Sequence, residues 1–128
     1  MTSDVAQMRD AYLRAALFTA SGEDGEPLNR EFDVTDFDDT SRTEAYAVCA
    51  SFVEQHAALL EEGESGVDPD QAGHDLWMTR NGHGAGFWEE EWGKAGERLS
   101  TAAARLGEAH VFLSENEDGG RYLYIAVA

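Results

Sequence analysis

At 128 residues, with 26 acidic side chains against nine basic ones, the chain has the length of one domain and a formal net charge of −17. This charge excludes ordinary binding to DNA, RNA or anionic membranes, because such binding needs basic side chains that neutralise phosphates. The single cysteine, Cys49, excludes an internal disulfide and a cysteine-based zinc site.

The length predicts a single acidic domain over residues 1–128, and the sequence predicts a cytoplasmic location. The start of the chain lacks a basic region followed by an apolar run, which a secretory signal requires. No stretch approaches the ~18 apolar residues that span a bilayer. We therefore expect a protein of a reducing compartment with no membrane partner.

The first expected element is a helix over residues 4–20, where apolar residues recur at helical spacing. The next segment, 21–41, is expected to be an ordered acidic loop, with eight acidic residues between Glu23 and Asp39. Its aspartates lack the spacing of a calcium-binding loop. Four apolar residues are expected to attach this loop to the core: Leu28, Phe32, Val34 and Phe37.

The clearest predicted helix covers residues 41–62, where an apolar stripe follows the i, i+3, i+4 pattern. Ser41 followed by Glu44 matches a capping box at its start. Cys49 and His56 fall on the apolar stripe, which favours a buried thiol and a buried histidine over catalytic roles. A solvated acidic connector is expected after this helix.

Asp68 as a cap and Pro69 in the first turn predict a third helix that runs to about Thr79. A last helix is expected over 87–106, closed by Gly107. The β-prone tail that follows contains one turn and predicts an antiparallel hairpin. The expected fold class is therefore α+β, with about four helices around one core and a C-terminal hairpin.

Residues 71–88 differ in character from the rest of the chain, because two of the four histidines and two of the three tryptophans lie there. The segment contains Gly73-His74-Asp75, then Trp77, then Thr79-Arg80-Asn81-Gly82-His83-Gly84-Ala85-Gly86-Phe87-Trp88. In this motif the chain resembles an uncharacterised family of small acidic proteins of bacteriophages and other mobile elements, with a GHDxWxTRNGHGAGFW-like signature. The resemblance implies a mobile-element origin and a bacterial or archaeal cytoplasm, and it implies no reaction.

Two chemical interpretations of the segment involve anions. The glycines of 82–86 at a helix start could bind a phosphate through backbone amides, although the three glutamates of 89–91 oppose it. Alternatively, His74 or His83 acts as a base while Arg80 holds an anionic group. No nucleophile except a threonine lies near them in the sequence.

A third chemical interpretation is a metal site made by His74, Asp75 and His83, with His110 as a further ligand. The spacing does not fix a complete ligand set, so no metal or cofactor is predicted. The structural interpretation is that the aromatic residues join two helices while the polar ones satisfy each other and the turn backbone. The polar residues in question are Asp75, Arg80, Asn81 and His83.

The leading functional hypothesis is a non-enzymatic inhibitor that binds a basic cleft by DNA mimicry. DNA as long as a compact domain of this size, roughly 35 Å, carries on the order of 20 negative charges, which is comparable to the net charge here. The expected partner is a host nucleic-acid-binding defence protein, of the kind that anti-restriction or anti-CRISPR proteins inhibit. The expected partner-binding carboxylates are those of Glu23, Asp24, Glu26, Glu31, Asp33, Asp36, Asp38, Asp39, Glu61, Glu62 and Glu64.

Three alternatives to this hypothesis stay open. The acidity, with one lysine among nine basic residues, also fits simple solubility or a salt-rich cytoplasm. A small metal-dependent or acid–base enzyme would be centred on the 73–88 motif. A structural subunit would instead use the aromatic residues as an interface, and a homodimer is compatible with either.

Overall fold

A computed structural model of the chain describes residues 2–20, 25–62, 68–82, 87 and 95–127. The elements in order are α1 (Thr2–Thr19), η1 (Leu28–Arg30), η2 (Val34–Asp36), α2 (Asp39–Glu62), α3 (Pro69–Arg80), α4 (Ala95–Ala104), β1 (Ala109–Glu115) and β2 (Arg121–Val127). The described residues thus form four α-helices followed by an antiparallel hairpin, which confirms the expected α+β class.

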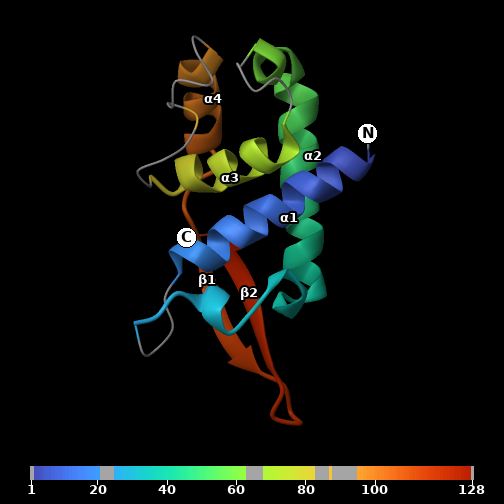
Figure 1. Cartoon of the computed structure of the whole chain (residues 1–128), viewed down its shortest axis with the longest axis vertical. Helices are drawn as coiled ribbons and strands as arrows, with labels where there is room; N and C mark the ends of the chain where they lie inside the picture. Colours follow the sequence, from blue (N-terminus) through green and yellow to red (C-terminus); the bar gives the residue numbers. More distant parts are fainter. Residues whose placement is uncertain (1, 21–24, 63–67, 83–86, 88–94, 128) are drawn as a thin grey trace.

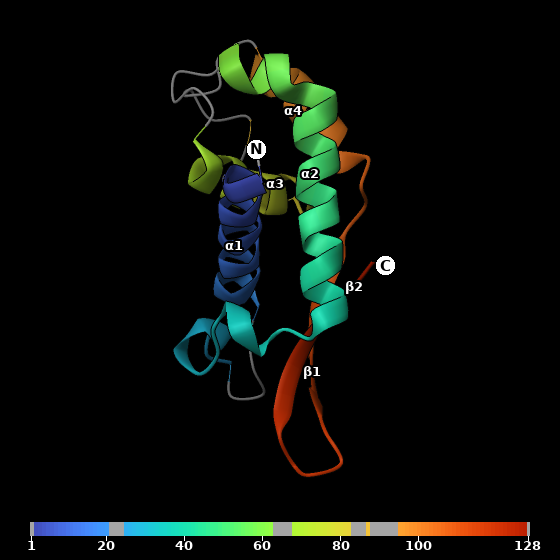
Figure 2. The same cartoon turned by 90° about the vertical axis from the view of Figure 1, so that its right-hand side faces the viewer.

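The helices pack around a core to which each of them contributes. Figure 1 shows α1 and α3 lying across the long helix α2, with α4 beside the upper part of the molecule. Figure 2 shows the hairpin projecting from the opposite, lower end, beyond the helices. Fully buried leucines from α1, α3, α4 and β2 meet in this core: Leu13, Leu17, Leu76, Leu99 and Leu123.

The contact between α1 and α3 is the closest between helices, and Gly73 makes it possible. A Cβ atom at this position would overlap the carbonyl oxygen of Met8 and lie 3.0 Å from the Cβ of Ala11. The absence of a side chain therefore lets the two backbones approach, and this explains the first glycine of the 73–88 motif in structural terms.

The described part of the acidic segment before α2, from residue 25 onward, contains the short helices η1 and η2. Asp33 caps η2, because its Oδ1 accepts from the Thr35 N–H at 2.8 Å while its own N–H donates to Asp36 Oδ2 at 2.8 Å. Leu28 and Phe32 are buried and attach the segment to the core.

The predicted capping box at Ser41 is wrong. α2 begins at Asp39, and Asp38 Oδ1 accepts from the Ser41 N–H at 2.8 Å. The Ser41 hydroxyl instead accepts a hydrogen bond from the Ile125 N–H at 2.9 Å, so it joins α2 to β2. The local pattern matched a cap, but the side chain is used for a tertiary contact.

Two further predictions need correction. Phe87 lies in a turn rather than in the first turn of the last helix, and α4 is described from Ala95 onward; the rest of the predicted start lies outside the described residues. His56, predicted to be buried, is half-buried and sits at a kink in α2 with φ −127° and ψ 20°. The cap at Asp68 is confirmed, whereas α4 ends at Ala104, before the predicted Gly107, which has a positive φ.

The hairpin is paired from Ala109 opposite Val127 to Glu115 opposite Arg121. An isolated parallel bridge between Phe37 and Leu123 attaches the hairpin to the acidic segment. Within the described parts of the chain, no helix is both long enough and apolar enough to cross a membrane.

The replacement Gly73→Ala should lower the free energy of unfolding by about 2 kcal/mol, because the new methyl group meets backbone that cannot move away. Helix propensity alone predicts a gain of about 1 kcal/mol from the same change. The exposed Ala47 of α2 supplies the control, since Ala47→Gly should lose about 1 kcal/mol. Urea denaturation of both variants measures the two differences, and a Gly73→Ala protein more stable than the parent would contradict the close contact.

Candidate functional site

Arg80, the last residue of α3, is only 6% exposed. Its side chain makes three hydrogen bonds to other segments of the chain. Its Nη1 donates to the Tyr12 hydroxyl at 2.8 Å. Its Nε donates to the carbonyl of Gly107 at 2.8 Å, and its Nη2 to that of Leu106 at 2.9 Å. These two carbonyls follow the C-terminus of α4, where a cation is favoured by the helix dipole. The guanidinium is therefore engaged by three protein acceptors, and the role of Arg80 in holding an anionic group stays a prediction.

Trp77 and Tyr12 connect α3 to α1. Their rings meet edge to face with centroids 5.1 Å apart, and Trp77 Nε1 donates to Thr19 Oγ1 at 2.9 Å. Burial raises the pKa of Tyr12 to about 12, so its phenol stays protonated and neutral beside Arg80. The aromatic residues of the motif that are described thus join two helices, as the structural interpretation expected.

Asn81 and Thr79 fix the backbone that leaves α3. Asn81 Oδ1 accepts from the Ala109 N–H at 2.8 Å, and its Nδ2 donates to the Trp77 carbonyl at 3.0 Å. Thr79 Oγ1 accepts from the Phe87 N–H at 3.0 Å. Asn81 therefore holds the first residue of β1 against the end of α3.

Of the polar residues of the motif, Arg80 and Asn81 bond mainly to other segments of the chain. Among the described residues, Arg80 and Asn81 bond to backbone carbonyls, to a tyrosine hydroxyl and to a strand N–H rather than to Asp75. His83 lies outside the described residues, as do the glycines of 84–86. The predicted phosphate loop therefore falls almost wholly outside the part of the chain that is described.

His74 and Asp75 form the chemically most suggestive pair of the motif. The Asp75 carboxylate is fully buried and accepts from Gln71 Nε2 at 2.7 Å. Its other oxygen lies 3.0 Å from His74 Nδ1, while the His74 side chain is 42% exposed. A carboxylate that orients a solvent-accessible imidazole is an arrangement able to accept or deliver a proton.

The candidate metal ligands that are described lie on two different elements of the fold. His110 lies on β1, exposed, whereas His74 and Asp75 lie on α3. No group of three or more histidine, cysteine, aspartate or glutamate side chains suited to a metal ion occurs among the described residues. Cys49 is fully buried, and burial raises the pKa of its thiol to about 12, which fits the predicted structural role.

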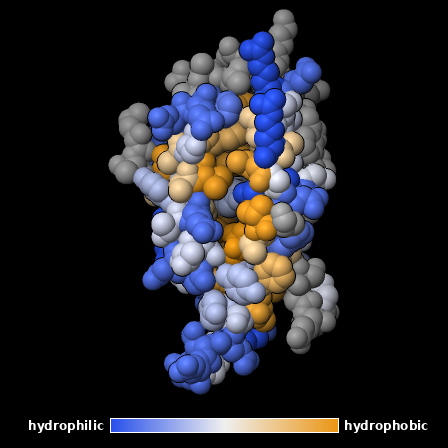
Figure 3. Space-filling model, turned by 180° about the vertical axis from the view of Figure 1, so that it is seen from behind, coloured by the Kyte–Doolittle hydropathy of each residue, from blue (hydrophilic) through white to orange (hydrophobic). Residues whose placement is uncertain are grey.

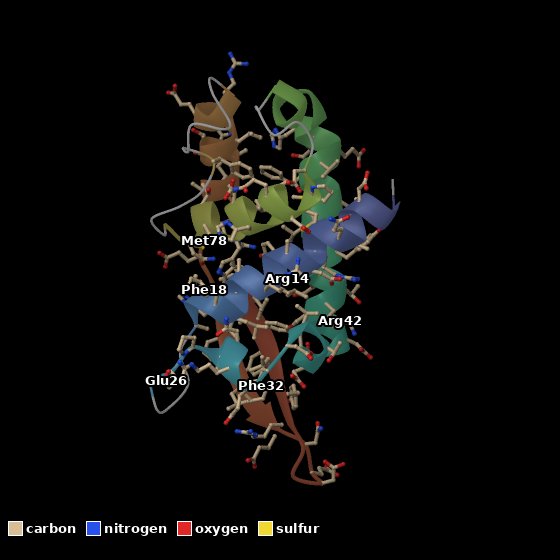
Figure 4. The ribbon with its side chains drawn as sticks, viewed as in Figure 1. Arg14, Phe18, Glu26, Phe32, Arg42 and Met78 are labelled. Atoms are coloured by element: carbon tan, nitrogen blue, oxygen red, sulfur yellow. The ribbon has the colours of Figure 1, made fainter. Side chains whose placement is uncertain are left out.

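A second feature lies at the lower end of the molecule, where the acidic segment meets the hairpin (Figure 1) and both contain several acidic residues. Glu31 pairs with Arg121 of β2 at 3.0 Å, and the Asp38 N–H donates to the carbonyl of Leu123 at 2.8 Å. Figure 4 shows Glu26 and Phe32 of this segment at the same end as the hairpin. We call this surface the acidic end and define it by Glu26, Glu31, Asp33, Asp36, Asp38, Asp39, Glu115, Glu117 and Asp118.

The acidic end differs from the predicted partner-binding set. The backbones of Glu61 and Glu62 lie at the far end of α2, which is 24 residues or roughly 36 Å long, so the structure separates them from the acidic segment. Their side chains, and residues Glu23, Asp24 and Glu64, lie outside the described residues. In their place the hairpin turn contributes three carboxylates. Sequence reasoning missed these, although three acidic residues within 115–118 were a visible signal.

Two cavities lie along α2. One, of about 490 Å³, is lined by Arg9, Asp39, Arg42, Thr43 and Tyr46, so two guanidinium groups mark the edge of the acidic end. The other, of about 290 Å³, lies between α2 and α4 and is lined by uncharged and apolar side chains such as Phe52 and Leu106. Figure 3, the view of the molecule from behind, shows hydrophobic residues along the middle of that side with hydrophilic residues around them.

No protein-family model, curated protein or solved structure matches this chain.

Replacing Arg80 by lysine should lower the free energy of unfolding by about 2–3 kcal/mol, because an ammonium cannot reach three acceptors in three directions. The exposed Arg98 of α4 is the matched control, and Arg98→Lys should change stability by less than about 0.5 kcal/mol. Chemical denaturation measures both. Equal stability of the two variants would show that the buried network does not hold α1, α3 and the hairpin together.

Proposed function

We propose that the chain is a non-enzymatic binding protein whose acidic end occupies the nucleic-acid site of a basic host protein, as a DNA mimic does. The observation that supports this proposal is that two acidic segments far apart in the sequence, the acidic segment and the hairpin, meet at one end of the molecule. Tertiary contacts such as Glu31 with Arg121 bring them together, so the clustering is not a consequence of sequence proximity.

The charge state of the acidic end supports the proposal. The acidic segment and the hairpin turn contain nine carboxylates against three arginines, Arg30, Arg42 and Arg121. Among the described residues, two of the nine carboxylates, Glu26 and Glu31, form ion pairs with an arginine. Hydrogen bonds from Thr35 lower the pKa of the Asp33 carboxyl, which therefore stays ionised to more acidic pH. Such a surface attracts a basic cleft over a distance and speeds association at low salt.

The resemblance of the 73–88 motif to proteins of bacteriophages and mobile elements supports a host defence protein as the target. A restriction or CRISPR nuclease binds DNA through a basic cleft, and a mobile element benefits when that cleft is blocked. The motif itself would then serve the fold, since Arg80 and Asn81 are engaged in holding the hairpin. In this proposal the protein acts in the cytoplasm of the host cell.

The first test is capture of partners from a bacterial lysate by the purified chain, followed by competition. We expect a basic nucleic-acid-binding protein that is released by rising salt and displaced by duplex DNA. Recovery of a partner that DNA does not displace would contradict mimicry.

The second test compares two triple variants with the same change in net charge. Neutralising three carboxylates of the acidic end should weaken partner binding about tenfold, whereas three exposed carboxylates elsewhere should matter little. Binding is measured by calorimetry with the captured partner, and equal losses would show a diffuse charge effect instead. The test variant carries Asp39→Asn, Glu115→Gln and Glu117→Gln, and the control carries Asp4→Asn, Glu54→Gln and Glu97→Gln.

A second candidate function, acid–base or metal-dependent catalysis, is favoured by one observation, the buried Asp75 beside the accessible His74. His74→Gln keeps a polar side chain of similar size and removes the titrating group. If catalysis is the function, this variant should fold normally and lose activity, and metal analysis of the purified protein should find a bound ion if a metal takes part. If His74→Gln binds the captured partner as the parent does, binding through the acidic end accounts for the function without it.

A further inference from the structure

We propose that the outer edge of β1 binds an extended basic segment of the partner as a third strand of the sheet. This inference rests on the proposed function, because the edge belongs to the same end of the molecule as the acidic end. It adds the way in which the partner is bound, namely by backbone hydrogen bonds in a fixed register. The hairpin projects beyond the helices and is accessible in both Figure 1 and Figure 2.

The direction of the β1 backbone groups follows from the hairpin ladder. The Asn116 N–H donates to the carbonyl of Gly120 at 2.6 Å, so this pair is hydrogen-bonded across the hairpin. Hydrogen-bonded and non-hydrogen-bonded pairs alternate along an antiparallel ladder, so the odd-numbered residues of β1 direct their N–H and C=O groups away from β2. Val111, Leu113 and Glu115 therefore present these groups at the outer edge.

The two edges of the hairpin differ. On β2, the carbonyl of Leu123 accepts from the Asp38 N–H, and the Ile125 N–H donates to a serine hydroxyl of α2. On β1, the N–H of Ala109 is bound by the asparagine that follows α3. Beyond that residue, no hydrogen bond to the outward backbone groups of β1 occurs in the described part of the chain. The acidic segment and α2 thus occupy the edge of β2, whereas beyond Ala109 no described residue bonds to the outer edge of β1.

The exposed apolar side chains of β1 favour contact with another protein strand over contact with water. Phe112 is 43% exposed and Leu113 is 41% exposed, one on each face of the hairpin. Phe112 also stacks on Tyr124 with centroids 5.3 Å apart, which makes a flat aromatic surface beside the edge. Natural edge strands are commonly protected by lysine, proline or a bulge, and β1 contains no lysine or proline and pairs without a bulge. A two-stranded hairpin gains stability from a third strand.

The negative charge around β1 determines which kind of segment fits its outer edge. Glu108 and Glu115 lie at the two ends of β1, and Glu117 and Asp118 follow in the turn. A second copy of this chain would bring a further net charge of −17 to the same place, which is repulsive. A segment with arginine or lysine is attracted, and an arginine can stack on the exposed ring of Phe112. The occupant is therefore an extended segment in which apolar and basic residues alternate.

The test uses a synthetic peptide of alternating arginine and valine, about eight residues long, the length of a long strand. Its counterpart has the same side chains and charge but is N-methylated at every second residue, which removes the donors of one strand edge. We expect the unmodified peptide to bind the full-length chain about tenfold more tightly by calorimetry, because strand pairing needs those donors. Amide exchange at Val111 and Leu113, followed by NMR, should slow only with the unmodified peptide.

A pair of variants tests the edge from the side of the chain. Leu113→Pro removes an outward N–H that the hairpin ladder does not use, and Leu113→Ala removes the same side chain but keeps the N–H. We expect the proline variant to lose the preference for the unmodified peptide and the alanine variant to retain it. If Leu113→Pro disturbs the hairpin, the comparison of the two peptides on the parent chain still tests whether the peptide binds by strand pairing.

The outcomes separate this inference from the proposed function. If both peptides bind equally and are released alike by salt, the contact is electrostatic, so strand addition is wrong while the acidic end still binds basic partners. If neither peptide binds at low salt, the acidic end does not attract basic segments, and both proposals are contradicted. If the chain alone sediments as a dimer that Leu113→Pro dissociates, a second copy occupies the edge and the basic occupant is wrong.

Discussion

The rest of the structure depends on the buried guanidinium of Arg80. This group is charged and almost fully inaccessible, and an unpaired charge in such a place would cost several kcal/mol. It is satisfied by Tyr12 from α1 and by the carbonyls of Leu106 and Gly107 beyond α4. One side chain at the end of α3 therefore couples two other helices and the start of the hairpin. If one of these elements shifted, a hydrogen-bond donor or acceptor would lose its partner.

This coupling gives the 73–88 motif a physical meaning. Gly73 allows α1 and α3 to approach, and Asn81 fixes the first residue of β1. The hairpin is then held at its far side by Ser41 and by the bridge of Phe37 to Leu123. The motif thus helps to set the position of the acidic hairpin beside the acidic segment, and the binding surface of the proposed function lies at a distance from the motif. His74 and Asp75 are the members of the motif whose arrangement also suits chemistry.

Sequence reasoning succeeded where the controlling interaction is local. Helical periodicity located α1 and α2, and the start signals Asp68 and Pro69 located α3, which Asp68 caps through N–H groups two and three residues away. It failed where a side chain is used over a long separation. The Ser41 hydroxyl binds a strand 84 residues away, and Arg80 binds Tyr12 across 68 residues, so no window of sequence contains both partners. The hairpin carboxylates of the acidic end were not predicted, because only folding brings the hairpin beside the acidic segment, where Arg121 pairs with Glu31.

Hydrogen–deuterium exchange of the chain, free and bound to the captured partner, tests the central claim most directly, since it compares the acidic end with the motif in one experiment. We predict slower amide exchange on partner binding in residues 25–41 and in β1, with no change around His74 in α3. Slower exchange confined to α3, with the acidic segment and hairpin unchanged, would contradict it and would place the functional surface at His74 and Asp75.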